Sequence, residues 1–348
     1  MTEYPAASDA ENLAAHAELF RLVNSNWKTQ AVSVAAELGL ADLLADGVNK
    51  ADKLAKATGC HTQSLHRLLR ALASLNICEE REDGSFALTT LGSLLRSDAP
   101  ASLRDLAIWG GKYQWPMWGH LLHSVKTGNS ARTLVEGTAS VDHPEHDPEA
   151  TDIFHRAMFQ ATRAVARAVV SAYDFSCFRR IVDVGGGYGE MLAAVLRAFP
   201  LARGVLFDLP TTLEGARRHL KNEGVLDRCE SIGGSFFDAV PGGGDGYILK
   251  SVIHDWNNKD SIAILRRCRE AMQRSAKLLL VEPVMPERVE HSLHHQDVAR
   301  RDLNVLVMLG SQERTKREYS ALLDSTGFSM RSIVPAALNF SVIEAACV

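Results

Sequence analysis

The sequence lacks the features that mark membrane, secreted and strongly charged proteins. No apolar run approaches the roughly twenty residues that a membrane-spanning helix needs. The amino terminus has neither a basic start nor an apolar core, so we expect no signal peptide. A formal charge of −4 provides no long-range attraction to nucleic acid or anionic membranes. These absences predict a soluble cytoplasmic protein with no membrane and no nucleic acid among its partners.

Cysteine is present without a pattern that would give it a structural role. The six cysteines are scattered and include no Cys-x-x-Cys pair, so we expect reduced thiols and no cysteine zinc site. No internal repeat or low-complexity tract is visible. The length of 348 residues and an ordinary share of hydrophobic residues, 46%, predict a globular chain of more than one domain.

Residues 1–105 predict a separate helical domain. Apolar residues recur at helical spacing over residues 12–47, and Gly39 and Gly47 mark helix ends. This surface is more apolar than a small domain needs, so we expect a partner subunit to cover it, with burial against the second domain as the alternative.

Residues 50–97 have the order of a winged helix, and its predicted parts are a helix over 50–58, a helix over 63–75, and short strands over 77–81 and 85–89. A winged helix can bind DNA or serve as a dimerisation module. Basic and acidic residues are equal in number over 51–105, and the wing, Glu79–Asp83, is acidic and would repel phosphate. We therefore favour dimerisation over DNA binding.

The rest of the chain predicts a helical segment over 106–175 and an α/β domain over 176–348. Apolar runs that alternate with helical patterns indicate a parallel sheet covered on both faces. Two final apolar runs with a short connection predict an antiparallel hairpin at the edge of this Rossmann-like sheet. We expect strands at 180–185, 203–208, 229–234, 246–251 and 277–283, helices at 188–199, 211–222, 259–273, 291–308 and 315–326, and the hairpin at 330–336 and 340–346.

A glycine turn follows the first of these strands. Gly185, Gly187 and Gly189 let a ligand lie against bare backbone, and Asp208, about twenty residues on, closes the next strand where an acid reaches ribose hydroxyls. The spacing differs from that of dinucleotide enzymes. Asp183, two residues before the turn, would repel a pyrophosphate but suits a sulfonium and an α-ammonium group. These residues favour S-adenosylmethionine over NAD.

His254 closes the fourth strand, in Leu249–Trp256. Ligands of open α/β sheets bind at the carboxyl ends of strands, so this histidine is expected near the cofactor as a general base. A hydrogen-bonded loop histidine is the alternative.

These blocks, together with Gly233–Phe237 and Gln312–Thr315, occur in an order that resembles the class I S-adenosylmethionine-dependent O-methyltransferases of the caffeate and hydroxyindole type, in the bacterial branch that acts on small molecules. The resemblance covers nearly the whole chain. It implies an intertwined homodimer built by the winged helix, with no metal. The residues that it assigns are Glu282 and Glu313 on either side of the catalytic His254; Asp183, Gly185, Gly187, Asp208, Ser235, Phe236, Lys250 and Thr162 for the cofactor; and Phe154, Met158, Asp255, Trp256 and Met308 for the substrate.

Two of these assignments carry open alternatives. Phe154 and Met158 belong to an apolar stripe that is more often core than pocket. Ser235 stands where the family commonly has an acid that accepts a hydrogen bond from the adenine amino group, and serine accepts it more weakly. A further cluster, His291, His294, His295 and Asp297, could ligate a metal, although a solvated lead-in to the next helix is the simpler interpretation.

The implied reaction is an in-line displacement in which His254 takes the proton of a phenolic hydroxyl. The same scaffold could methylate an amine or an activated ring carbon. A winged-helix regulator that senses S-adenosylmethionine is the alternative outside the enzymes. The sequence does not identify the acceptor.

Overall fold

The computed structural model describes residues 9–136 and 148–348, and the chain divides into two compact units. The first unit comprises Met1–Trp115 with Asp152–Ala157, and the second comprises Pro116–Thr151 with Met158–Val348. Within the described residues, no helix is long and apolar enough to cross a membrane.

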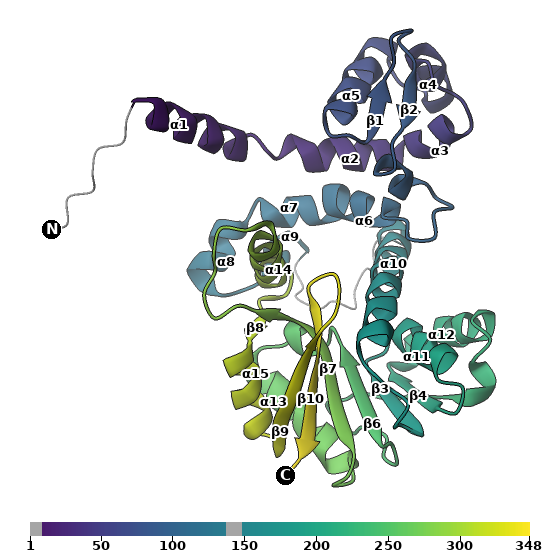
Figure 1. Ribbon diagram of the computed structural model, residues 1–348, viewed down its shortest axis with the longest axis vertical. Coiled ribbons are helices and arrows are strands. Elements are labelled where there is room, and N and C mark those ends of the chain that lie inside the picture. The colour runs from purple at the N-terminus through teal and green to yellow at the C-terminus, as the bar shows by residue number, and fades with distance from the viewer. Residues whose placement is uncertain (1–8, 137–147) are drawn as a thin grey trace, which may run out of the picture. The chain divides into compact units, whose positions relative to one another are not determined.

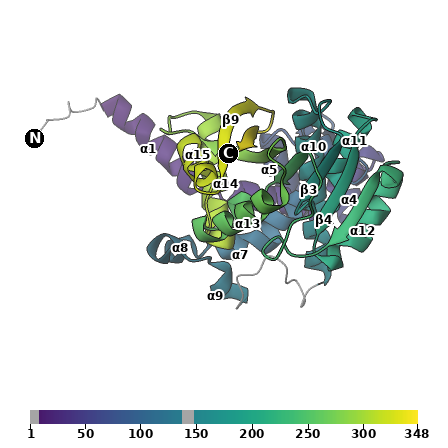
Figure 2. The ribbon, with the colours of Figure 1, turned by 90° about the horizontal axis from the view of Figure 1, so that it is seen from below.

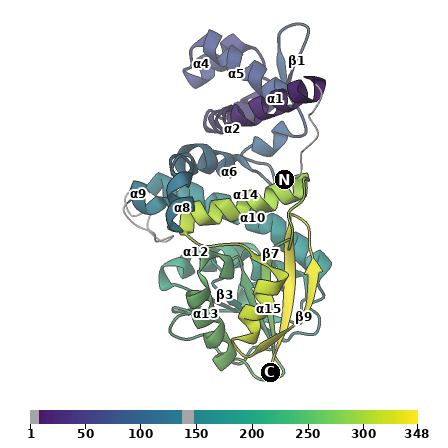
Figure 3. The same ribbon diagram turned by 90° about the vertical axis from the view of Figure 1, so that its left-hand side faces the viewer.

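The first unit consists of short helices and one hairpin, and the expected winged helix is confirmed. Leu65, Leu69 and Leu72 lie at helical spacing in the second helix of the motif and are buried against the hairpin residue Phe86. Figure 3 shows the two helices beside the hairpin. The elements are α1 (Asp9–Val23), α2 (Trp27–Glu37), α3 (Leu40–Ala45), α4 (Ala51–Thr58), α5 (Thr62–Ser74), β1 (Cys78–Glu80), β2 (Phe86–Leu88), η1 (Gly92–Leu95), α6 (Arg104–Ile108) and η2 (Trp109–Gln114).

Helix α1 has no buried residue in the single chain. Its apolar side chains Leu13, Leu19, Phe20, Leu22 and Val23 are between 62% and 72% exposed. An apolar face this open is typical of a surface that another molecule covers.

The second unit is organised around a sheet of order β5-β4-β3-β6-β7-β10-β9, which Figure 1 shows in teal, green and yellow. The five strands from β5 to β7 are parallel, as the alternation of strands and helices predicts. The near-continuous burial of β3, β4, β6 and β7 is typical of a parallel sheet with both faces covered. The parallel strands are β3 (Arg180–Val184), β4 (Arg203–Asp208), β5 (Cys229–Gly233), β6 (Gly246–Lys250) and β7 (Lys277–Met285).

Helices cover both faces of this sheet (Figure 2). Apolar residues of α10 (Pro148–Ala172), α11 (Glu190–Ala198) and α12 (Pro210–Asn222) form one core cluster with the sheet. Residues of α13 (Asn258–Ala271) and α15 (Lys316–Asp324) form the other. The remaining elements are α7 (Trp115–Trp118), α8 (Leu121–Thr127), α9 (Arg132–Glu136), η3 (Leu226–Arg228), η4 (Ile253–Asp255) and α14 (Leu293–Leu309).

The predicted antiparallel hairpin is confirmed at the carboxyl end of the chain. It consists of β9 (Phe328–Pro335) and β10 (Phe340–Cys347). Strand β10 lies between β7 and β9, so β9 forms one edge of the sheet, opposite the edge formed by β5. The sequence analysis missed β8 (Arg314–Thr315), which pairs with the end of β7. Two residues are too short to carry an alternating pattern.

The order of the strands creates a switch point beside β3. The chain runs from β3 outward through β4 to β5 and then returns to β6 on the other side of β3. Loops at the carboxyl ends of β3 and β6 therefore diverge, which is where open α/β sheets bind ligands.

Candidate active site

The glycine turn lies at the carboxyl end of β3. Gly185, Gly187 and Gly189 all have positive φ angles, which residues other than glycine rarely adopt. At Gly186 a Cβ atom would lie 2.5 Å from Leu206 and 2.6 Å from the Asp183 carboxylate, so this position has no space for a side chain. The turn thus exposes bare backbone at the start of α11.

Asp208, at the end of β4, holds this turn. One carboxylate oxygen accepts the Gly187 N–H at 2.7 Å, and the other accepts the Leu209 N–H at 2.7 Å. A carboxylate has about four acceptor sites, so both oxygens can still accept hydrogen bonds from ribose hydroxyls.

Asp183 is fully buried beneath the turn, and neither of its oxygens has a well-formed hydrogen bond among the described residues. Burial and the nearby Asp208 raise the pKa of its carboxyl to about 7, and Lys250 partly opposes this shift. A buried carboxylate without a close partner favours a cation bound above the turn. The site therefore fits a ligand that carries positive charge, such as S-adenosylmethionine.

Lys250 is the last residue of β6, the strand beside the one that carries Asp183. Its ammonium donates a hydrogen bond to the Thr162 hydroxyl of α10 at 2.9 Å, and burial lowers its pKa to about 8. The structure thus brings together Lys250 and Thr162, both assigned to the cofactor by the sequence analysis.

The loop after β5 adds an aromatic cluster. The Phe236 ring lies near Gly185 and packs edge-on against Trp256, with ring centroids 5.9 Å apart. Trp256 also packs against Phe237, with ring centroids 4.8 Å apart. Trp256, which was predicted to contact the substrate, thus packs in the same aromatic cluster as Phe236, the proposed adenine contact. The Ser235 hydroxyl accepts the Phe237 N–H at 3.2 Å, a local use that leaves acceptor capacity.

His254 lies in η4, directly after β6, and is surrounded by acids. Its Nδ1 lies 3.0 Å from Glu313 Oε1 and 3.7 Å from Glu282 Oε2, and its Nε2 lies 3.2 Å from Asp255 Oδ1. His254, Glu282 and Glu313 are all buried. The three residues predicted to form the catalytic group are therefore adjacent in space, although Glu313 is distant in sequence.

This arrangement controls the charge of the imidazole. Burial alone lowers its pKa, but Glu282, Asp255 and Glu313 together outweigh burial and raise the pKa of His254 to about 10. Burial also raises the pKa of the Glu282 carboxyl to about 7. The group therefore holds a proton strongly in the ligand-free protein, and a nearby positive charge weakens that hold.

The backbone around His254 is fixed from two directions. Glu282 Oε1 accepts the N–H groups of Val252 and Ile253, each at 2.9 Å. Arg314 is fully buried and donates to the carbonyl oxygens of Ile253 and Trp256, each at 2.8 Å. The sequence analysis assigned no role to Arg314, although it directly follows Glu313 in a motif that the analysis used.

The remaining predicted substrate residues are Phe154, Met158 and Met308. Phe154 belongs to the first unit, where its ring lies 4.9 Å from that of Trp109. Met158, of α10, is half-buried, and Met308, near the end of α14, is buried. Their roles stay predictions.

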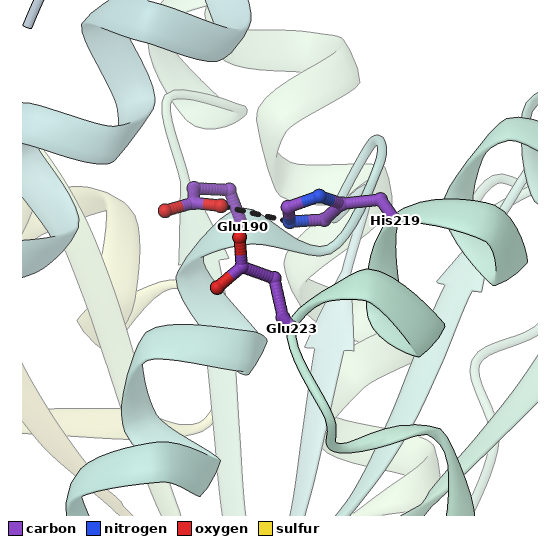
Figure 4. A group of neighbouring side chains, drawn as sticks. All are labelled: Glu190, His219 and Glu223. Atoms are coloured by element: carbon purple, nitrogen blue, oxygen red, sulfur yellow. Dashed lines mark ion pairs between the residues drawn. The ribbon is translucent and has the colours of Figure 1, made fainter. Parts of the chain in front are cut away.

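A second group, of two acids and a histidine, includes Glu190, the first residue after the glycine turn (Figure 4). Glu190 begins α11 and is buried, and one of its carboxylate oxygens lies 2.7 Å from His219 Nε2 of α12. Arg163 lies 3.8 Å from Glu190 and 3.7 Å from Glu223. Arg197 pairs with the same two glutamates. Two guanidinium groups already balance the two carboxylates, so we interpret the group as an ionic link between α10, α11 and α12 rather than a metal site.

We predict that Glu190→Gln destabilises the protein by about 2 kcal/mol, because it removes the buried carboxylate that pairs with His219 and with the partly exposed Arg163 and Arg197. Urea unfolding measures this loss. The matched control is Glu230→Gln, which breaks the exposed pair of Arg180 and Glu230, and exposed pairs contribute little. Equal stability of the two variants would contradict the interpretation, as would stabilisation of the wild type by Zn²⁺.

The histidines of residues 291–295 do not form a metal site in the described part of the chain. They are absent from the groups of side chains close enough to share an ion there. His294 Nδ1 lies 2.7 Å from Asn339 Oδ1, and His295 Nδ1 accepts the Glu290 N–H at 2.8 Å. Only His291 precedes α14, which begins at Leu293; His294, His295 and Asp297 lie in the first turns of this helix.

Comparison with known proteins places the chain in a family. The O-methyltransferase domain family matches residues 118–329, and the O-methyltransferase dimerisation domain matches residues 20–98. The chain belongs to the O-methyltransferase family, as the resemblance in its sequence indicates.

Three relatives illustrate the similarity. Phenazine O-methyltransferase PhzM of Lysobacter antibioticus is 43% identical over 94% of this chain and 95% of its own length. The 8-amino-8-demethylriboflavin N,N-dimethyltransferase of Streptomyces davaonensis is 35% identical over 99% of this chain and 97% of its own. A solved structure of NcsB1, an O-methyltransferase from neocarzinostatin biosynthesis, contains S-adenosylmethionine and 2-hydroxy-5-methyl naphthoic acid. It has a TM-score of 0.79 at 31% identity, covering 92% of this chain and 96% of its own. The protein is thus an S-adenosylmethionine-dependent methyltransferase.

Proposed function

We propose that this enzyme transfers a methyl group to a hydroxyl of an aromatic small molecule, with His254 as general base. The observation that carries the proposal is the buried set of His254, Glu282 and Glu313 at the carboxyl ends of β6 and β7, next to the strand β3 that carries the glycine turn. The roles of Asp183, Gly185, Gly187, Asp208, Phe236 and Lys250 in holding the cofactor are part of the same proposal.

The residues of the chain perform three tasks in this mechanism. S-adenosylmethionine, when bound, supplies an electrophilic methyl group on a sulfonium. With the Nδ1–H donated to Glu313 at 3.0 Å, Nε2, which lies 3.2 Å from Asp255 Oδ1, is the nitrogen that takes the proton of the acceptor hydroxyl. Phenol and imidazole differ by roughly 3.5 pKa units in water, and the carboxylates around His254 narrow this gap by raising the basicity of the imidazole. Alignment of the reacting atoms provides most of the remaining rate enhancement.

The relatives favour a planar, fused aromatic acceptor. Phenazine and naphthoic acid appear in the descriptions of two of them, and neocarzinostatin biosynthesis in one. We propose a similar acceptor in the biosynthesis of a secondary metabolite, with Phe154, Met158, Asp255 and Met308 among the residues that contact it.

A methyl-transfer screen tests the reaction. Purified enzyme with tritiated S-adenosylmethionine is offered phenolic, naphthoate and phenazine acceptors. We expect label to enter hydroxylated acceptors and not the same ring systems without a hydroxyl. Transfer that is independent of the hydroxyl would contradict the proposal.

Transfer to nitrogen is the second candidate, because the similar enzyme from Streptomyces davaonensis is an N,N-dimethyltransferase. Matched pairs of phenol and aniline on one ring system distinguish the two. A neutral amine keeps its proton until after attack, so N-methylation has less need of a base. If His254 variants retain amine transfer, nitrogen is the true acceptor.

We also propose that two copies of the chain form a homodimer through the exposed apolar face of α1. We predict that Phe20→Asp shifts the protein from dimer to monomer in light scattering, because charge on a buried apolar face is costly. The matched control is Leu201→Asp, which changes a 76% exposed leucine outside the dimerisation domain. A dimer that survives Phe20→Asp at micromolar concentration would contradict this assignment.

A further inference from the structure

Arg301 is a charged residue of the catalytic region that the proposed mechanism does not use. It lies on α14, and its guanidinium stands 4.7 Å from the centre of the Phe340 ring. Its Nε is buried, lies 3.9 Å from Glu313 Oε1, and has no hydrogen-bond partner among the residues that the structure describes. The side chain is 27% exposed, so a planar ring and a carboxylate, rather than solvent, determine where its charge lies.

The oxygen beside Arg301 is the same one that contacts the proposed base. Glu313 Oε1 is 3.0 Å from His254 Nδ1 and 3.9 Å from Arg301 Nε. A positive charge at that distance stabilises the ionised carboxylate and competes with a protonated imidazole for it. Arg301 and a protonated His254 therefore compete for the same carboxylate oxygen of Glu313.

Charged groups from every packed element bear on this site. Acids come from β7, η4, α14 and the residue before β8, and cations come from β6, α14 and β8, with one phenol from α15. They are Glu282, Asp255, Asp302 and Glu313; Lys250, Arg301 and Arg314; and Tyr319. Lys250 is hydrogen-bonded to Thr162, and Arg314 donates to backbone carbonyls. Arg301 alone among these cations is ion-paired with the oxygen that His254 uses.

We propose, building on the assignment of His254 as base, that Arg301 is a positioning residue that weakens the hold of the surrounding acids on the His254 proton by offsetting the charge of Glu313. The three acids favour the imidazolium cation, which cannot accept a proton until that preference is weakened. Arg301 shifts that balance toward the neutral ring, and Phe340 holds the guanidinium in place.

Two other roles for Arg301 make different predictions. A purely structural role, packing on Phe340, affects turnover equally at every pH. Recognition of an acidic group on the acceptor affects KM for acidic acceptors and leaves the pH dependence of turnover unchanged. The ion pair with Glu313 favours the electrostatic role, since an acidic acceptor group at Arg301 would also face the Glu313 carboxylate.

The test compares the pH profiles of kcat for the wild type, Arg301→Gln, Arg301→Lys and Arg300→Gln at saturating cofactor and acceptor. Loss of the positive charge stabilises the protonated imidazole and raises its pKa, so the acidic limb of Arg301→Gln moves upward. We expect a shift of about one pH unit, and hence about tenfold lower kcat on the acidic side. Arg301→Lys keeps the charge and restores the wild-type limb.

Arg300→Gln is the matched control, because it removes one positive charge from an exposed neighbour on the same helix. An unchanged limb in Arg301→Gln overturns the proposal, as does an equal shift in Arg300→Gln or an effect confined to KM for acidic acceptors. Failure of the base assignment is recognised separately, because His254→Ala would then retain turnover in the wild-type background. If the acidic limb of the pH profile depends on His254 but does not move when Arg301 is replaced, only the role of Arg301 is overturned.

Discussion

Replacing His254 with alanine is expected to lower turnover by roughly 10²- to 10⁴-fold and to leave cofactor affinity unchanged. The imidazole is positioned to accept a proton, and the proposed cofactor contacts come from the glycine turn, Asp208 and Lys250. The measurement is single-turnover methyl transfer with saturating cofactor, combined with calorimetric titration of S-adenosylhomocysteine. The glutamine variant, which is close in volume to histidine, separates loss of the base from loss of packing.

The control for this experiment is His291→Ala, which removes an exposed histidine before α14. It should retain wild-type turnover. Turnover of His254→Ala within a few-fold of the wild type would reject the base assignment, and a parallel loss of cofactor binding would show that the loop had collapsed.

The second large effect is expected at Asp208, on the cofactor rather than on the chemistry. Asp208→Ala removes the hydrogen bond at 2.7 Å that holds Gly187 and the acceptor that we assign to the ribose. Hydrogen bonds to a charged group contribute about 1.5–3 kcal/mol each, so we expect cofactor affinity to fall about 100-fold. At saturating cofactor, kcat should recover to near the wild-type value, as calorimetry and steady-state kinetics can establish.

Asp227→Asn serves as the control for Asp208, because it removes an exposed acid at the opposite, amino-terminal end of β5. Cofactor affinity should be unaffected there. If Asp208→Ala binds S-adenosylhomocysteine as tightly as Asp227→Asn does, the acid at the end of β4 does not hold the cofactor.

Much of the second unit could be predicted from the sequence because its strands are apolar and its turns are rich in glycine. The position of the glycine turn and of Asp208 follows from the strand–turn–helix–strand pattern. The family resemblance was needed to assign both Glu282 and Glu313. The parallel pairing of β6 and β7 explains why Glu282 lies beside His254, whereas Glu313 is 59 residues from His254.

The residues that the sequence analysis missed act through contacts that no local pattern contains. Arg314 reaches back to the carbonyl oxygens of Ile253 and Trp256, and an arginine beside an acid carries no signal for such a contact. The group of Glu190, His219 and Glu223 joins three helices whose packing only the fold reveals. Arg301 depends on β10, which brings Phe340 beneath it.

The most direct test of the account is the identity of the atom that receives the methyl group. The enzyme is supplied with S-adenosylmethionine carrying a ¹³C methyl and with an aromatic acceptor that offers both a hydroxyl and an amine, and the product is examined by NMR. We predict a single O-methyl resonance that His254→Ala fails to produce. An N-methyl or C-methyl resonance, or an O-methyl resonance of equal rate in His254→Ala, would contradict the account.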